Sequence, residues 1–341
     1  MGRSKAGGSV VMYVLLGLFA VILTAALFGP RLRFRPAGEP PAVPRDSVAL
    51  EQWIAEREAA FDDIIPGAEK GIVWASPETP GRTDYAVVYI HGFSASRREI
   101  HPFPQLIADA LGANSYWTRL AGHGRTDVDA MGTMDAGDWY ADALEALAVG
   151  EAIGDRIILV ATSTGVTLAT VLVEQFPERI HALVAVSPNY GPANRAAWIT
   201  AGPWGEQIGA RVMGPYRSWR PQNELHGRYW TTRYPSRAIP VMMSLVAYGR
   251  RIRHQRLPVP MIQFSAPGDT VIEYDWSIRV FDRWGSRLSP TPPKELVIVE
   301  DSTDPGRHVI TGDIRSPENT GRLAGLAVRF LRSLESEGQP K

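Results

Sequence analysis

The sequence predicts an α/β fold in which helices cover both faces of a mostly parallel central sheet. Short apolar runs rich in valine and isoleucine, typical of buried strands, alternate along the chain with segments of helical periodicity. This alternation is typical of parallel sheets, because the crossover between two parallel strands usually carries a helix. The chain has 341 residues, 45% of them hydrophobic, which is ample for a sizeable core.

A membrane anchor with flanking basic residues is expected over residues 1–35. No charged residue lies between Ala6 and Pro30, and the twenty residues 9–28 are almost wholly apolar. A helix of that length spans the roughly 30 Å hydrocarbon core of a bilayer. Five basic residues flank the run on both sides, so the positive-inside rule leaves the side of the following domain undetermined: Arg3, Lys5, Arg31, Arg33 and Arg35.

Two other interpretations of this apolar run, a cleaved signal peptide and a buried core helix, fit its sequence less well. A cleaved signal peptide usually has a shorter apolar region and a clear small-residue cleavage site, which this segment lacks. A buried core helix would show polar positions at helical spacing, and none occur. We therefore expect an uncleaved, single-pass anchor, followed by an extended proline-rich linker over residues 36–46.

The first part of the core, residues 47–191, contains most of the predicted elements. Helical spacing of apolar residues predicts helices, and continuous apolar runs rich in valine and isoleucine predict strands. The predicted helices are 47–64, 136–150 and 166–175, and the predicted strands are 71–76, 85–90, 115–120, 156–161 and 181–186.

The alternation of predicted strands and helices stops after residue 191 and resumes at residue 259. Residues 192–258 interrupt it and are long enough to form a lid inserted into the core. The second part of the core, residues 259–341, has predicted strands at 261–265 and 295–300 and a closing helix at 316–336.

Composition excludes several kinds of site. The chain has no cysteine, which excludes disulfides, thiolate zinc sites, iron–sulfur clusters and a cysteine nucleophile. Its 36 basic and 36 acidic residues balance, so no overall positive field indicates a nucleic-acid partner. The balance is uneven along the chain, because residues 195–256 hold eleven arginines against Glu206 and Glu224.

A candidate nucleophile lies between a predicted strand and a predicted helix, in the segment ATSTG at residues 161–165. The pattern is close to G-x-S-x-G, the turn that exposes a serine at the end of a strand. This turn needs very small residues two positions before and two after the serine. Gly165 satisfies the second position and Ala161 approximates the first, so Ser163 is the candidate nucleophile. The alternative is an ordinary serine- and threonine-rich helix cap.

Donors for a developing oxyanion are expected on either side of this serine. One is the backbone N–H of Thr164, directly after the nucleophile. The other is the backbone N–H of Phe93, in the segment YIHGF that ends the earlier strand. His91 in that segment is expected to order the loop, because it precedes the serine in the chain.

A serine nucleophile needs a base and a carboxylate that orients the base. Asp269 lies in a turn directly after the strand at 261–265. Only one of the seven histidines follows it, His308, in a loop after the strand at 295–300. This gives the chain order serine, acid, histidine that is expected for such a sheet. Rival acids are Glu273, Asp275, Asp301 and Asp304.

Five segments together resemble the α/β-hydrolase superfamily: YIHGF, LAGHG, ATSTG, PGDTV and GRHV. The LAGHG loop is similar to the branch of monoacylglycerol lipases, lysophospholipases and serine aminopeptidases. The resemblance covers residues from about 70 to 335, apart from most of the insertion, and departs from the usual pattern at Ala161, where glycine is common. It implies the α/β-hydrolase fold, with these site residues: Ser163 as nucleophile, Asp269 as acid, His308 as base, and Phe93 and Thr164 as oxyanion donors.

The expected function is that of a serine hydrolase that cleaves carboxylic esters with an acyl chain, through an acyl-enzyme and without metal or organic cofactor. An aminopeptidase or amidase is the alternative, although its insertion would need a carboxylate for the substrate ammonium and offers only Glu206 and Glu224. A non-catalytic binding protein on the same scaffold is a third possibility, which the complete set of Ser163, Asp269 and His308 argues against. A dehalogenase is excluded, because it would have an aspartate nucleophile in place of the serine.

The insertion also carries eight tryptophans and tyrosines among its arginines. These side chains suit a lipid headgroup boundary, so the insertion could face a membrane and admit a lipid substrate. Equally, the aromatic rings could pack the insertion onto the core while the arginines pair with the acidic body.

Overall fold

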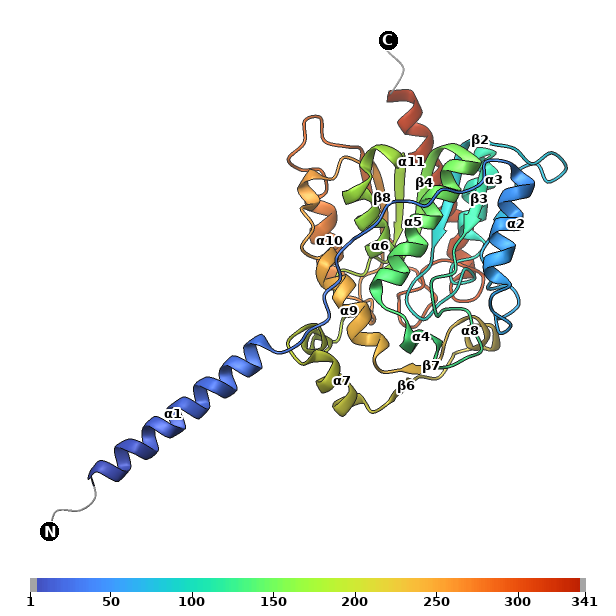
Figure 1. Cartoon of the computed structure of the whole chain (residues 1–341). Helices are drawn as coiled ribbons and strands as arrows, with labels where there is room; N and C mark the ends of the chain where they lie inside the picture. The colour runs from blue at the N-terminus through green and yellow to red at the C-terminus, as the bar shows by residue number, and fades with distance from the viewer. Residues whose placement is uncertain (1–4, 338–341) are drawn as a thin grey trace.

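The computed structural model describes residues 5–337 and has a seven-stranded central sheet (Figure 1). The order is β1-β3-β2-β4-β5-β8-β9, and every neighbouring pair is parallel except β1 with β3. The strands are β1 (Gly71–Val73), β2 (Thr83–Ile90), β3 (Asn114–Trp117), β4 (Gly154–Thr162), β5 (Ala182–Val186), β8 (Met261–Ser265) and β9 (Lys294–Ile298). The predicted fold class is confirmed.

Helices cover both faces of this sheet, because the strands alternate their side chains between two apolar layers. In β2, Ala86 and Val88 face one layer, whereas Val87 and Tyr89 face the other. The first layer is completed by α5 (Ala136–Ile153), α6 (Thr164–Gln175) and α10 (Tyr274–Arg283), and the second by α3 (Phe103–Leu111) and α11 (Pro317–Glu337).

Several core elements differ from the sequence-based expectation, and β1 and β3 each end three residues before the predicted ends at 76 and 120. Helix α2 (Ser47–Glu58) ends before the predicted residue 64, because Asp63 instead binds the side chain of Arg125 and the N–H of Asp127. Helices α3 and α10 were not expected. Both are short, and α3 begins with Pro102 and Pro104 nearby, which hides its helical pattern.

Residues 192–258 lie between β5 and β8 and fold into short elements. These are η2 (Arg195–Ala201), α7 (Gly205–Met213), β6 (Tyr216–Ser218), α8 (Glu224–Tyr229), β7 (Arg233–Pro235), α9 (Ala238–Gly249) and η3 (His254–Arg256). Helix α9 buries Val241 and Leu245 in the first apolar layer. Part of the insertion is therefore built into the core.

The N-terminal segment forms α1 (Lys5–Phe28), which projects away from the body (Figure 1). Among the described residues, Val10–Phe28 is the one helical stretch long and apolar enough to cross a membrane, with a mean hydropathy of 2.7. The apolar side chains of this stretch are exposed, and none of the stretch is buried inside the protein. The basic residue Arg3 lies outside the described residues.

The chain after α1 does not leave the body as a free linker but lies along it (Figure 1). Phe34 is 7% exposed, and its ring meets those of Tyr140 and Tyr248 edge-on at 5.6 and 5.3 Å between centroids. Leu32 and Val43 also pack against the core. The segment that follows α1 is therefore fixed to α5 and α9.

Replacing Phe34 by alanine is expected to lower the free energy of unfolding by about 3 kcal/mol, because it empties a buried aromatic site. Chemical denaturation of the purified chain measures this. Val48→Ala, at an exposed position of α2, is the matched control and should change stability by less than about 0.5 kcal/mol. Equal stability of the Phe34 variant and the wild type would contradict docking of this segment.

Candidate active site

The carboxyl ends of the parallel strands bring three distant residues together. Ser163 follows β4, Asp269 follows β8 and His308 follows β9. The distance from His308 Nδ1 to Asp269 Oδ2 is 2.7 Å, and that from His308 Nε2 to Ser163 Oγ is 3.0 Å. All three residues are less than 10% exposed. A hydroxyl, an imidazole and a carboxylate thus form one hydrogen-bonded chain.

Ser163 occupies a strained turn between β4 and α6. Its φ of 52° and ψ of −119° are unusual for a residue with a side chain. The turn is held because the N–H of Ser163 donates to Val186 O at 2.9 Å, while its own carbonyl accepts from Asn189 N at 3.1 Å. These bonds fix the serine backbone from β5 and the loop after it.

The small residues around the serine have a direct steric reason. A Cβ on Gly165 would lie 2.2 Å from the carbonyl oxygen of Ile90, so this position admits glycine alone. Ala161 is fully buried in β4, between Ile90 of β2 and Ala185 of β5. The sheet therefore accommodates the methyl group of Ala161 where glycine is common.

The loop after β8 presents Asp269 in one orientation. Gly268 precedes it with a φ of +80°, a backbone conformation that residues with a side chain rarely adopt. The Asp269 Oδ1 atom accepts from the N–H groups of Val271 and Ile272 at 2.8 and 3.0 Å, which leaves Oδ2 for His308. Both carboxylate oxygens are therefore held by hydrogen bonds.

The rival acids face other groups. Glu273 lies near three arginines, with Arg250 at 3.4 Å and two others at 3.7 Å. Asp301 pairs with Arg322 at 2.7 Å, and Asp275 is exposed at the start of α10. Asp304 is the exception, because it contacts the backbone of His308.

Asp304 supports the histidine loop, a role that the sequence did not reveal. Its Oδ2 accepts from the N–H groups of His308 and Val309 at 2.9 and 3.0 Å, and its Oδ1 pairs with Arg315. Burial alone would raise the pKa of Asp304, but these hydrogen bonds and the Arg315 charge hold it below its usual value. Ser187 completes the support by donating to His308 O at 2.6 Å.

The charges around His308 favour its protonated form. Burial of the imidazole lowers its pKa, but the adjacent Asp269 carboxylate outweighs that effect, with further help from Glu99 and Asp304. The net result is a pKa of His308 above its usual value. The imidazole can therefore take up a proton in this site at little cost.

The loop after β2 lies directly against the serine. A Cβ on Gly92 would be 2.8 Å from Glu99 Oε1 and 3.1 Å from Ser163 Cβ, so the absence of a side chain eases this close approach. The structure gives the N–H of Phe93 no partner among residues 5–337. The N–H of Thr164 is the first of α6 and has no intrahelical partner. Both predicted donors thus lack a hydrogen-bond partner among the described residues, and their role at the oxyanion stays a prediction.

Glu99 is a second residue that the sequence did not reveal. Its Oε2 atom accepts from Gly92 N at 2.6 Å and from Tyr89 Oη at 3.1 Å. Burial raises the pKa of Glu99 to about 7, although the Gly92 bond and the nearby His308 oppose the shift. No motif spacing marks this residue, because only the tertiary fold places it behind Gly92.

His91 orders its loop, as expected, rather than facing the serine. Its Nε2 atom accepts from the N–H of Leu120 at 3.0 Å, which ties the β2 loop to the LAGHG loop. Burial lowers the pKa of His91 well below its usual value, so the ring is neutral and can accept this bond.

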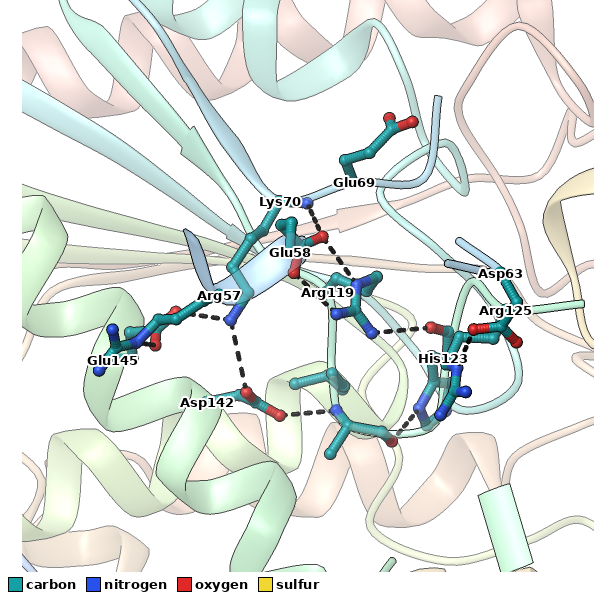
Figure 2. Close-up of polar contacts among 12 residues, drawn as sticks. Arg57, Glu58, Asp63, Glu69, Lys70, Arg119, His123, Arg125, Asp142 and Glu145 are labelled. Carbon is teal, nitrogen blue, oxygen red and sulfur yellow. Dashed lines mark hydrogen bonds and ion pairs between the residues drawn. The ribbon is translucent and has the colours of Figure 1, made fainter. Parts of the chain in front are cut away.

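Ionic contacts hold the LAGHG loop from behind (Figure 2). Asp142 of α5 accepts from Ala121 N at 2.6 Å, and Arg119 pairs with Glu58 of α2 at 2.7 Å. Lys70 lies 2.8 Å from Glu145 and 3.9 Å from Asp142, which links this loop to β1. The LAGHG loop is therefore anchored by a backbone hydrogen bond to α5 and by an ion pair to α2.

Comparisons with known proteins agree with this fold. A model of the alpha/beta hydrolase family matches residues 87–327. A search of curated proteins gives no match.

Solved structures of lipolytic enzymes share the fold at low sequence identity. One of the metagenome-derived lipolytic enzymes LipS and LipT matches with a TM-score of 0.62 and 20% identity, covering 79% of this chain and 99% of that chain. A soluble variant of the Saccharomyces cerevisiae monoglyceride lipase gives 0.59 and 16%, covering 80% and 93%. The Paleococcus ferrophilus monoacylglycerol lipase gives 0.57 and 15%, covering 78% and 98%. The expected resemblance to the monoacylglycerol-lipase branch is confirmed at the level of the fold.

Gly165→Ala is expected to lower the free energy of unfolding by about 1–3 kcal/mol, because its methyl group would collide with the backbone of β2. Thermal or chemical denaturation measures the change. The matched control is Gly321→Ala in α11, where no atom lies within 4 Å of the new methyl group. That variant should gain up to about 1 kcal/mol from helix propensity. Equal effects at the two sites would refute the steric argument.

Proposed function

This chain belongs to the alpha/beta hydrolase family, and from that premise we propose that it is a serine hydrolase that cleaves carboxylic esters. The observation that carries the proposal is the hydrogen-bonded chain from Asp269 through His308 to Ser163. This arrangement supplies the base that a serine needs to act as a nucleophile near neutral pH.

In the proposed mechanism, His308 begins neutral with its proton on Nδ1, facing Asp269. Its Nε2 atom then accepts the proton of Ser163 as Oγ attacks the ester carbonyl carbon. The Asp269 carboxylate stabilises the imidazolium that forms, consistent with the raised pKa of His308. The imidazolium returns the proton to the leaving alkoxide as the carbon–oxygen bond breaks, which leaves an acyl group on Ser163.

The carbonyl oxygen becomes negative in this step, and the N–H groups of Phe93 and Thr164 are the proposed donors to it. Phe93 follows Gly92, whose N–H donates a hydrogen bond to Glu99 and so fixes this part of the loop. The N-terminus of α6 adds favourable potential at the same point. Water, activated by His308, then hydrolyses the acyl group and restores the free serine.

We propose an ester or lipid with an acyl chain as the substrate class. Support comes from the fold shared with lipolytic enzymes and from the apolar helix next to the catalytic body. The aminopeptidase alternative gains no support, because Glu206 is paired with Arg237 at 2.8 Å and Glu224 lies exposed at the start of α8. No metal or organic cofactor takes part in the proposed reaction.

We also propose that α1 anchors the chain in a membrane and that residues 192–258 form a lid facing that membrane. Trp204 of this insertion donates from its indole Nε1 to Ala25 O of α1 at 2.8 Å. The neighbouring α7 exposes Ile208 and Val212, the latter by 78%, beside the end of α1. The division into an anchor (1–35), linker (36–46), two core parts (47–191 and 259–341) and this lid stays a prediction.

Ser163→Ala is expected to abolish labelling by a fluorophosphonate probe and to lower kcat by about ten-thousandfold or more, because the nucleophile is lost. The full chain in uncharged detergent is assayed with p-nitrophenyl esters of rising acyl-chain length. Ser218→Ala, at an exposed position of β6, should label like the wild type. No labelling of folded wild-type protein would favour the non-catalytic binding protein and refute the proposal.

Glu99→Gln is expected to move the acid limb of the kcat/KM profile to lower pH. The Glu99 carboxylate helps to raise the pKa of His308, and the reaction needs neutral His308, so removing that charge keeps the base active at lower pH. The glutamine can still accept from Gly92, so kcat should fall by about tenfold at most. Glu78→Gln, which is exposed, is the control. An unshifted limb in the Glu99 variant would contradict this electrostatic role.

A further inference from the structure

A cavity of about 420 Å³ lies directly after the apolar helix, away from Ser163. One wall is the segment that follows α1, with Arg31, Arg33 and Arg35. The other wall comes from the insertion, with Ala201, Ser244, Ala247, Tyr248 and Arg251. Four arginines therefore line one cavity together with apolar and aromatic surface.

These arginines carry charge that the protein itself does not neutralise. Arg31 donates to the carbonyl of Leu27, a neutral partner. Arg33, Arg35 and Arg251 are exposed and make no ion pair with any carboxylate in residues 5–337.

Three other arginines of the insertion do have a carboxylate partner, among them Arg237 and Arg250. Arg237 pairs with Glu206 at 2.8 Å and Arg250 with Glu273 at 3.4 Å. The cavity thus brings four arginines without a carboxylate partner among the described residues together in one place, and an anion is the ligand that fits them.

The position of the cavity identifies the source of that anion. The apolar stretch Val10–Phe28 is long enough to span the bilayer core, and Arg31 follows Phe28 by three residues. Three residues reach about 10 Å, so the cavity lies within the headgroup region of a bilayer crossed by α1.

The body is held at this depth by direct contact with α1. The backbone N–H of Trp204 donates to Pro30 O at 2.7 Å, and its indole donates to Ala25 O. A Cβ on Gly29 would lie 2.0 Å from the indole Nε1, so the ring packs directly on that glycine. The insertion and the end of α1 are therefore in direct contact (Figure 1).

We propose that this cavity binds the phosphate of an anionic phospholipid headgroup from the surrounding bilayer. Arginine guanidinium groups bind phosphate through paired, charge-assisted hydrogen bonds. The bound headgroup bridges the segment after α1 and helix α9, and so fixes the orientation of the catalytic body on the membrane. This inference rests on the proposed membrane span of α1, and it adds a lipid site separate from the ester site at Ser163.

The test uses the full chain in an uncharged detergent and follows thermal unfolding by tryptophan fluorescence. The protein is titrated with dioctanoyl phosphatidylglycerol, dioctanoyl phosphatidylcholine and inorganic phosphate. A ligand that binds the folded state raises Tm in a saturable way. We expect saturation with phosphatidylglycerol and no saturable rise with the zwitterionic lipid or with inorganic phosphate.

Arginine variants test whether phosphatidylglycerol binds at this cavity. The triple variant Arg33→Gln, Arg35→Gln, Arg251→Gln should weaken phosphatidylglycerol binding by about a factor of five per arginine. The matched triple variant Arg283→Gln, Arg287→Gln, Arg329→Gln removes three exposed arginines outside the cavity and should bind like the wild type. Native mass spectrometry of lipid retained by each variant gives a second measurement that does not depend on Tm.

Three outcomes would overturn the proposal. In the first, phosphatidylcholine raises Tm as much as phosphatidylglycerol does. In the second, the cavity variant binds phosphatidylglycerol as tightly as the wild type does. In the third, inorganic phosphate raises Tm as much as phosphatidylglycerol does, which would make this a site for free phosphate. Ester hydrolysis by the cavity variant should be unchanged, because none of its three arginines contacts the triad. If the wild type hydrolysed no ester, the proposed function would be refuted and the lipid site would not. If carbonate extracted the wild type from membranes, the proposed membrane span of α1 would be refuted.

Discussion

The site depends on the close approach of the N-terminus of α6 to the backbone of β2. Gly165 makes this approach possible, since any larger residue would collide with the carbonyl of Ile90. The same approach forces Ser163 into its positive-φ turn and brings Gly92 against it. One steric constraint therefore sets the positions of the hydroxyl and of the two free N–H groups beside it.

Buried carboxylates then orient the loops that surround the serine. Glu99 holds the β2 loop through the N–H of Gly92, Asp142 holds the LAGHG loop through Ala121, and Asp304 holds the histidine loop. Each carboxylate accepts from at least one backbone N–H group, which opposes the effect of burial, although burial still raises the pKa of Glu99 and of Asp142 to about 7. The polar groups of the candidate site are thus held by hydrogen bonds within the protein itself, which is the preorganisation that the proposed mechanism requires.

The segment after α1 links this core to the apolar helix. Phe34 fastens it to α5 and α9, and Trp204 fastens the insertion to the end of α1. Because α9 also contributes to the apolar layer that carries α6, the helix, the insertion and the sheet are connected through packed side chains. This connection gives the body a defined orientation relative to α1, where a free linker would leave it undefined.

The sequence by itself determined the α/β class, the apolar helix and the segments that carry Ser163, Asp269 and His308, because strand composition, the glycine of the turn and the order of the residues are local properties. Only the tertiary structure decided which acid faces the histidine, since Asp269 and Asp304 both lie near it. It also revealed the carboxylate of Glu99 behind Gly92. Such pairings join residues that are distant in the chain and depend on how the strands are ordered in the sheet, which no local pattern encodes.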